Sequence, residues 1–410
     1  MRLIFFILFS SLVFGDDLKS LLEFAKQNNN LLNASKLSIL SKEKELNSAK
    51  DSYYPTIDAN TFYTRTDKPN SFMPKITYGT TLKVGFDIYD ASKKCNTKKQ
   101  KMEELSSVDF SYKQNLKSTS LSIVKDFYNL KTLYATLDVK TQASKVLKAQ
   151  LYRVEQFYDA KMTTRDNVDK LQSEYDKNTY DIQALKFKIF SLKRLLELQV
   201  GRVINTLDNS KFKKEFIAKS LELDDIKVIK HDKKALEHLS ETIDSYYYPN
   251  IRIEDSYTFY GYEDKPIFAG QTIPLLDTQN ELIITLNLRL FDFGTLAEQK
   301  QSIKLKADSL NEQILYKSKE QEMQLELAFK RIKVQNLKII SAKSALKFAK
   351  NTFKTITQKY NVGIVDNVVY LDALFSYTQA KALYEKSLND LEIAYAIYYY
   401  YNSQKLEEYL

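Results

Sequence analysis

Two long stretches of this sequence contain neither glycine nor proline, and they constrain the fold more than any other feature. They cover residues 91–159 and 295–360. Glycine and proline are the residues that most disfavour a helix interior, so each stretch is predicted to form one long helix. At a rise of about 1.5 Å per residue, each helix would be about 100 Å long. The 410-residue chain has only 8 glycines and 6 prolines, which predicts few turns and a mainly α-helical fold.

A pair of strand-like segments precedes each long helix. We expect strands at about 54–66, 76–89, 248–262 and 280–293. Apolar and polar residues alternate in these segments, which is the pattern of a strand with one apolar face. The polar side includes the charged residues Asp58, Lys83, Asp87, Arg252, Glu254 and Arg289.

Much of the sequence occurs twice. Pro55 and Pro249, each preceded by two tyrosines, are 194 residues apart. Asp90 and Asp292, each preceded by an aromatic residue, are 202 residues apart. We therefore expect a duplicated unit of helix, β-hairpin, long helix and helix. The predicted repeats cover residues 16–205 and 225–401, with a linker or equatorial segment at 206–224 and a short tail at 402–410.

Each repeat has a joint at which a helix becomes a strand. The two joints consist of Tyr53, Tyr54 and Pro55 in the first repeat and of Tyr247, Tyr248 and Pro249 in the second. Proline lacks an amide hydrogen and disfavours a helical residue before it. The prolines are therefore predicted to end the helices and to start the strands.

A short turn is expected at the far end of each long helix, where the chain reverses into an antiparallel helix. The predicted tips are residues 158–168 and 360–368. Apolar residues at heptad spacing precede both tips, which is typical of coiled-coil packing. Gly363 suits the left-handed position that commonly ends a helix. Lys161 occupies the equivalent position of the first tip, so that turn cannot rely on glycine.

The first residues have the pattern of a secretory signal peptide. Arg2 precedes an apolar run from Leu3 to Phe14, and Gly15 is a plausible cleavage point. The run is too short to span a bilayer as a helix. We expect residues 1–15 to be a signal peptide; the alternative is a buried N-terminal helix.

Four strands with one apolar face each cannot close into a membrane barrel, because about eight strands form the smallest one. An open edge in lipid would also leave backbone groups unpaired. A trimer would supply twelve strands, with the apolar faces toward lipid and the charged residues named above toward a water-filled lumen. A soluble sandwich with its apolar faces packed together is the alternative. Long helices leave the same end of both hairpins, which favours the barrel.

In these features the chain resembles the TolC-type outer-membrane efflux and secretion channels, over roughly residues 16–401. The resemblance rests on the two Tyr-Tyr-Pro joints, on the opening DDLKSLLEFAKQNNNLLNASKLSILSKEKELNSAKDSYYPTI, and on three later motifs. Those motifs are Phe291-Asp292-Phe293-Gly294, Tyr360-Asn361-Val362-Gly363 and Leu371-Asp372-Ala373. The order, spacing and duplication of these motifs are together more specific for the family than any single motif.

The resemblance implies a homotrimer with a twelve-strand outer-membrane barrel that is continuous with an α-helical barrel in the periplasm. Such proteins are passive ducts and not enzymes. They are the exit channels of tripartite efflux or type I secretion systems, and a periplasmic adaptor connects them to an inner-membrane pump of the RND or ABC class. The paired tyrosines of the joints would then lie at the membrane–water boundary, where aromatic residues flank barrels.

The resemblance also implies a periplasmic gate at the tips. The candidate gate residues are Tyr158, Lys161, Tyr360, Gly363, Val369 and Asp372. Asp372 matches an acid that forms a ring in the family, whereas Val369 stands where a companion acid would be. Threefold symmetry would bring three Asp372 carboxylates toward the axis and attract cations. The alternative is a solvated acid near a helix N-terminus.

Other functions have weaker support. No nucleophile, acid–base pair or phosphate loop indicates an enzyme, and no cofactor is expected. The net charge of +9 is spread over mixed Lys and Glu, so nucleic acid is not an expected partner. His231 and His238 lack companions for a metal site. The tyrosines at 398–401 are expected to pack the last helix near the barrel junction, as interfacial anchors. A trimeric coiled-coil adhesin without a transport role is the alternative to a channel.

Overall fold

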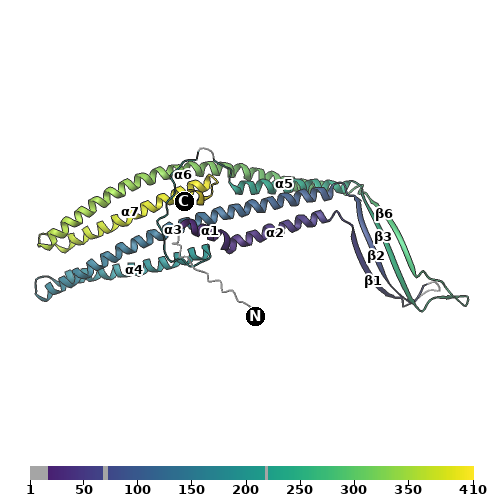
Figure 1. Cartoon of the computed structure of the whole chain (residues 1–410), viewed down its shortest axis with the longest axis horizontal. Coiled ribbons are helices and arrows are strands. Elements are labelled where there is room, and N and C mark those ends of the chain that lie inside the picture. Colours follow the sequence, from purple (N-terminus) through teal and green to yellow (C-terminus); the bar gives the residue numbers. More distant parts are fainter. Residues whose placement is uncertain (1–16, 68–72, 218–219) are drawn as a thin grey trace, which may run out of the picture. The chain divides into compact units, whose positions relative to one another are not determined.

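The structure is a computed structural model that describes residues 17–67, 73–217 and 220–410 (Figure 1). The predicted signal peptide, residues 1–15, lies outside the described residues. The first half contains α1 (Leu18–Asn28), α2 (Asn30–Asp51), β1 (Thr56–Arg65), β2 (Ile76–Tyr89), α3 (Lys93–Asp159) and α4 (Arg165–Val200). The second half contains α5 (Asp224–Asp244), η1 (Ser245–Tyr247), β3 (Asn250–Glu263), β4 (Ile267–Phe268), β5 (Gln271–Thr272), β6 (Thr278–Asn287), α6 (Thr295–Asn361), α7 (Asn367–Tyr401) and η2 (Leu406–Tyr409). The order confirms a mainly α fold with a β portion.

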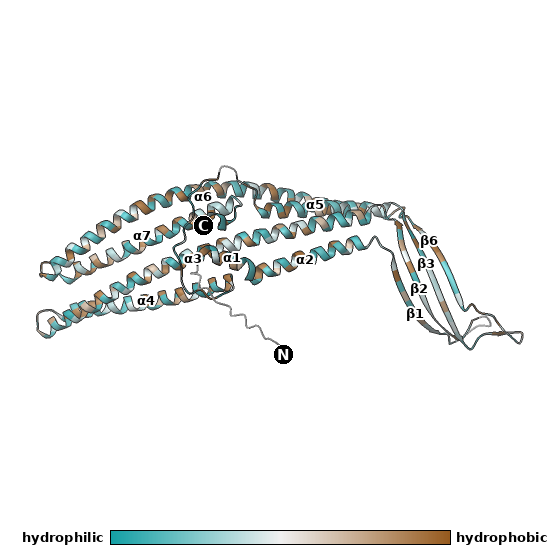
Figure 2. Ribbon diagram, viewed as in Figure 1, coloured by the Kyte–Doolittle hydropathy of each residue, from teal (hydrophilic) through white to brown (hydrophobic). Residues whose placement is uncertain are grey.

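The chain divides into two compact units, which are described separately. The helical unit comprises Met1–Lys36, Ser111–Asp225 and Lys317–Leu410, and the sheet unit comprises Leu37–Phe110 and Ile226–Tyr316. Figure 2 shows that hydrophobic and hydrophilic residues are interspersed along α3 and α6. In residues 17–67, 73–217 and 220–410, the structure has no helix that is both long and apolar enough to cross a membrane.

The sheet unit contains a four-stranded antiparallel sheet in the order β1-β2-β3-β6. β1 and β6 are its two edges. Alternate residues face opposite sides of a sheet, so the register divides the side chains into two sets. We call the set that contains Asp58, Lys83 and Arg252 the polar face, and the set that contains Ile57 and Ile284 the apolar face. The apolar face is largely exposed within one chain.

The same geometry joins each hairpin to the long helix that follows it. Two successive residues have positive φ at both places: Ala91 (52°) and Ser92 (66°), and then Phe293 (55°) and Gly294 (86°). A preceding aspartate accepts a hydrogen bond from the first turn of the helix in each case, with distances of 2.7 Å and 3.0 Å. The repeated aromatic-Asp pair is thus a helix-starting turn, in which a side-chain oxygen satisfies an otherwise free backbone donor.

The helical unit has a large core built from α1, α3, α4, α6, α7, η2 and the irregular segment after α4. Phe127, Tyr128 and Tyr399 are fully buried in it. Phe212 of the irregular segment packs on two of these rings, with centroid distances of 6.4 Å to Tyr128 and 5.9 Å to Tyr399. Glu392 accepts a hydrogen bond from the Phe212 amide at 2.8 Å, and burial raises the pKa of its carboxyl. The last helix is therefore fastened by aromatic packing and by backbone hydrogen bonds.

The tyrosine run at 398–401 packs the end of the last helix, but the interfacial role expected for it is wrong. Tyr398 and Tyr399 are buried in the helical unit, and the Tyr399 ring stacks on Tyr409 at 4.0 Å. The Tyr398 hydroxyl accepts a hydrogen bond from the Ile217 amide at 3.0 Å. An anchor at a membrane surface needs exposed rings, whereas these rings are covered by the segments before α5 and after α7.

Candidate functional site

Both helix tips end in the same turn, although one uses lysine and the other glycine. Lys161 and Gly363 have φ values of 57° and 76°, and their amides donate to the carbonyls of Tyr158 (2.9 Å) and Tyr360 (3.1 Å). The next residue in each tip donates to the carbonyl five residues back, at 2.7 and 2.9 Å. This pair of bonds is the Schellman motif. The lysine therefore adopts the left-handed conformation that glycine adopts more easily.

Exchanging these two residues is expected to change the stability of the tips in opposite directions. Gly363→Lys should destabilise its tip by about 1 kcal/mol, because a side chain at positive φ is strained even where space is free. No atom lies within 4 Å of a Cβ built at Gly363, so steric contact adds nothing. Lys161→Gly should stabilise the first tip by a smaller amount, since glycine also loses more backbone entropy on folding. Amide hydrogen exchange at the two turns measures both effects, and shifts of equal sign would contradict this explanation.

The two helix tips, α3–α4 and α6–α7, pack against each other through a buried cluster in the helical unit. Its members are Leu147, Leu151, Val154, Val168, Leu171, Tyr360, Tyr370, Leu371 and Leu374. Tyr360 stacks on Tyr370 at a centroid distance of 4.7 Å, and the Arg153 guanidinium lies 5.2 Å from the Tyr360 ring. Burial raises the pKa of both tyrosine hydroxyls. The neutral, stacked tyrosines therefore connect α6 and α7 to α3 next to the turns.

The other gate candidates face outward from this cluster. Tyr158, Val369 and Asp372 are exposed. The Arg165 guanidinium lies 5.7 Å from the Tyr158 ring. Asp366 accepts a hydrogen bond from the Val369 amide at 3.0 Å and so caps α7. Asp372, one turn further along α7, thus has an exposed carboxylate on the surface of a single chain.

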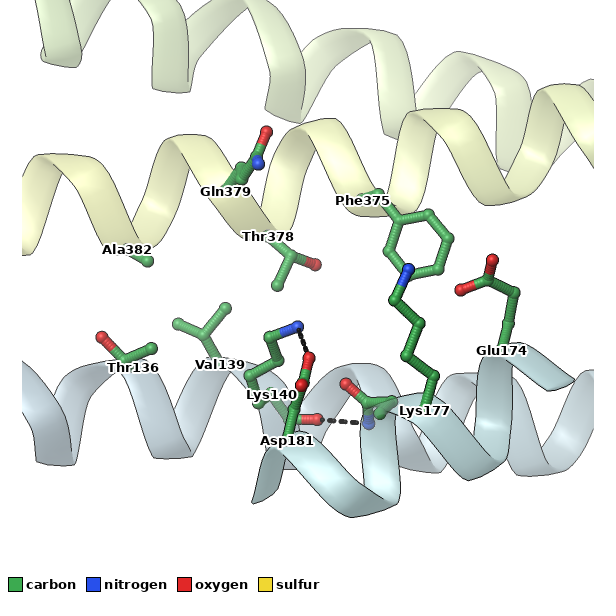
Figure 3. Close-up of a pocket in the computed structure, with 11 residues that line it drawn as sticks. Thr136, Val139, Lys140, Glu174, Lys177, Asp181, Phe375, Thr378, Gln379 and Ala382 are labelled. Atoms are coloured by element: carbon green, nitrogen blue, oxygen red, sulfur yellow. Dashed lines mark hydrogen bonds and ion pairs between the residues drawn. The ribbon is translucent and has the colours of Figure 1, made fainter. Parts of the chain in front are cut away.

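A groove lies between the α3–α4 hairpin and α7 (Figure 3). Its volume is about 410 Å³. Lys140 of α3 forms an ion pair of 2.9 Å with Asp181 of α4, and Lys177 extends from α4 toward Phe375 of α7 (Figure 3). Asn178 is buried, and its carbonyl oxygen has no hydrogen-bond partner among the described residues. The groove therefore combines an apolar wall with charged groups and a free acceptor.

The charged residues predicted on the strands lie on one face of the sheet, except that Arg289 follows the last residue of β6. Four of them form a connected network. Arg252 bonds to Asp87 at 2.9 Å and to Glu254 at 2.7 Å, and Glu254 bonds to Lys83 at 2.7 Å. Lys94, at the start of α3, adds an ion pair to Asp87 at 2.9 Å. The polar face thus carries paired charges, as a water-exposed surface does.

Sequence reasoning missed two glycines that shape the polar face. A Cβ at Gly85 would lie 2.4 Å from the Arg252 guanidinium, and one at Gly79 would lie 2.9 Å from the Phe62 ring. The strands bring these groups across the glycines, because Gly79 is paired with Phe62 of β1, and Gly85 is paired with Glu254, two residues from Arg252. A glycine inside an otherwise regular strand signals such a close approach. The spacing of Gly79 and Gly85 on the polar side of the strand could have indicated it.

The joint residues lie where the two predicted joints were placed in the sequence. In the first, the Tyr54 amide donates to the Asp51 carbonyl at 3.0 Å and Pro55 precedes β1. In the second, the Tyr247 hydroxyl donates to Asp292 at 3.2 Å, which ties the start of β3 to the start of α6. Tyr53, Tyr54, Tyr247 and Tyr248 are all exposed in the single chain. The joints therefore present aromatic rings at one end of the sheet.

Comparisons with known proteins identify the fold. No protein-family model and no curated protein matches the sequence. Among solved structures, the CmeC outer membrane channel of Campylobacter jejuni has a TM-score of 0.83 at 13% identity, over 94% of this chain and 85% of that one. The outer membrane protein VceC of Vibrio cholerae has a TM-score of 0.78 at 14% identity, over 95% and 96%. The MtrE outer membrane channel of Neisseria gonorrhoeae, in its open state, has a TM-score of 0.78 at 14% identity, over 95% and 89%.

These likenesses extend over almost the whole of each chain. The protein therefore has the fold of the TolC-type outer-membrane channels, which confirms the fold class and the resemblance inferred from the repeated motifs.

Proposed function

We propose that the protein is a trimeric outer-membrane channel that serves as the exit duct of a tripartite efflux or type I secretion system. The observation that carries this proposal is the sheet. It has one exposed apolar face, one face of paired charges and two open edges. A closed cylinder of three such sheets would place the apolar faces in lipid, enclose a polar lumen and leave no unpaired edge.

The remaining parts of the proposal follow from the same architecture. The chain would be a passive conduit, and an inner-membrane RND or ABC pump would supply the energy through a periplasmic adaptor. The tips and the groove between the α3–α4 hairpin and α7 would contact the adaptor. The exposed Asp372 carboxylates of three copies would form a cation-attracting ring at the periplasmic end. The named neighbours are outer membrane proteins and channels, which supports a duct over an adhesin.

Loss of the protein is expected to raise the intracellular accumulation of several antibiotics and of a fluorescent pump substrate. The purified chain should be trimeric in detergent and should conduct ions in a planar bilayer. Asp372→Asn should weaken block of that conductance by divalent cations, because it removes the ring charge while preserving size. A monomer without conductance would overturn the channel. Unchanged accumulation together with loss of a secreted protein would overturn the efflux role and assign the duct to secretion.

A further inference from the structure

The two hairpins of the sheet have the same register, residue for residue. Thr56 pairs with Gly85 in the first hairpin, and Asn250 pairs with Asn287 in the second. The offset between the equivalent strands β1 and β3 is 194, and between β2 and β6 it is 202. All pairs of β1 with β2 convert into the pairs of β3 with β6 by these offsets. The sheet is therefore two equivalent hairpins joined by one seam, between β2 and β3.

That internal seam predicts the geometry of a second seam, between β6 of one copy and β1 of another, which we call the outer seam. If a second copy adds to the sheet in the same way, its β1 stands to β6 as β3 stands to β2. The ion pair Asp87–Arg252 crosses the internal seam at 2.9 Å. The offsets convert Asp87 into Arg289, and Arg252 into Asp58. The outer seam thus has the same two charges with the signs exchanged, and opposite charges again face each other.

Neither charge of the outer seam has an ion-pair partner in its own chain, within the residues that the structure describes. Within its own chain, Arg289 has electrostatic interactions with Asp292 and Tyr247. The charges of the internal seam, by contrast, are fully engaged: Asp87 bonds to Arg252 and Lys94. A missing neighbour explains this difference between equivalent positions.

The length of β6 and the exposed apolar side chains are also consistent with a second copy that pairs with β6. β6 ends at Asn287, whereas its equivalent β2 continues to Tyr89, the counterpart of Phe291. The last residues of β2 pair with β3 alone. The end pair Tyr89–Ile251 converts into Phe291 opposite Ile57, and these side chains are 71% and 76% exposed in one chain. An aromatic side chain opposite a β-branched one is a favourable cross-strand pair.

We propose that β6 of one copy pairs with β1 of a second copy of this chain in the register of β2 with β3. Arg289 then forms an ion pair with Asp58 of the partner subunit, and Asn287 lies opposite Asn60 of the partner subunit. The inference rests on the proposed homotrimer and adds to it the register of the seam and the residues that determine it. An arrangement in which two β6 edges meet would leave Arg289 without the opposite charge of Asp58.

Cysteine cross-linking tests the register. In a Cys95→Ser background, Asn60→Cys combined with Asn287→Cys should give a covalent trimer on non-reducing gels after mild oxidation. Directly opposite residues have Cα atoms about 4.5–5.5 Å apart, which a disulfide can bridge. The matched control pairs Asn60→Cys with Ile283→Cys, on the same face but four residues along the strand. It should cross-link less by at least about tenfold, since its Cα atoms would be more than 7 Å apart.

The outcomes separate this inference from the proposed function. A trimer by light scattering that cross-links through the control pair and not through 60 and 287 would overturn the register and leave the channel in place. A monomer would overturn both.

A charge exchange tests the ion pair itself. Arg289→Asp should lower the temperature at which the trimer dissociates in detergent, because two carboxylates then face each other across the seam. Asp58→Arg added to Arg289→Asp should restore that temperature. The rescue cannot arise from Asp292, because Asp58→Arg changes the opposite side of the seam. A double variant no more stable than the single variant would overturn the pair.

Discussion

Ile284→Arg is expected to prevent most of the protein from assembling in the outer membrane, whereas Ile283→Arg is expected to be tolerated. Ile284 lies on the apolar face of β6, with 64% of its side chain exposed. If that face meets lipid, an arginine there costs about 2–4 kcal/mol near the middle of the bilayer. The neighbouring Ile283 lies on the polar face, opposite Glu254. An arginine there would face water and a carboxylate.

The comparison of these two variants tests only which face of the sheet the arginine side chain points to. Both variants change the same residue type to the same residue in the same edge strand, so they share any loss of β propensity. The readout is the amount of protein in the outer-membrane fraction and the fraction that runs as a trimer without heating. Equal loss in both variants would indicate a general weakening of β6. Equal assembly of both would show that the apolar face does not contact lipid.

Phe127→Ala is expected to be the most destabilising single truncation in the helical unit. The Phe127 side chain is 0% exposed, and its ring lies 5.3 Å from the Tyr128 ring in a T-shaped arrangement. Removing a buried phenylalanine ring costs about 3–5 kcal/mol, because the surrounding core fills the cavity only in part. The expected consequence is faster amide hydrogen exchange in the core segments of α3 and α7, with the sheet unit unchanged.

Phe187→Ala is the matched control for this truncation. Phe187 is on α4 in the same unit, but 69% of its side chain is exposed. The same change there should alter stability by no more than about 0.5 kcal/mol. Comparable amide hydrogen exchange in the two variants would have one of two meanings. Either the core around Phe127 repacks without losing stability, or Phe187 is covered in the assembled trimer. Repeating the comparison on monomeric and trimeric fractions distinguishes these two results.

Local features of the sequence determined the elements of this protein. The absence of glycine and proline from 91–159 and 295–360 predicted α3 and α6, because helix formation depends on residues within a few positions of each other. Alternation with a period of two predicted strands with one apolar side, because successive side chains in a strand point to opposite faces. The duplicated joints predicted the order of the parts, and the structural neighbours confirmed the fold.

Only the tertiary structure decided which side chains meet. That Arg252 bonds to Asp87 depends on the register of β2 and β3, strands that are far apart in the sequence. That the tyrosines near 399 are buried depends on the segment around Phe212, which has no periodic pattern to predict its position. Lys161 adopts the same left-handed turn as Gly363, with the same pair of backbone hydrogen bonds, although its residue type does not favour it. Local sequence selects the elements, but their contacts depend on packing between distant segments, which no short-range pattern encodes.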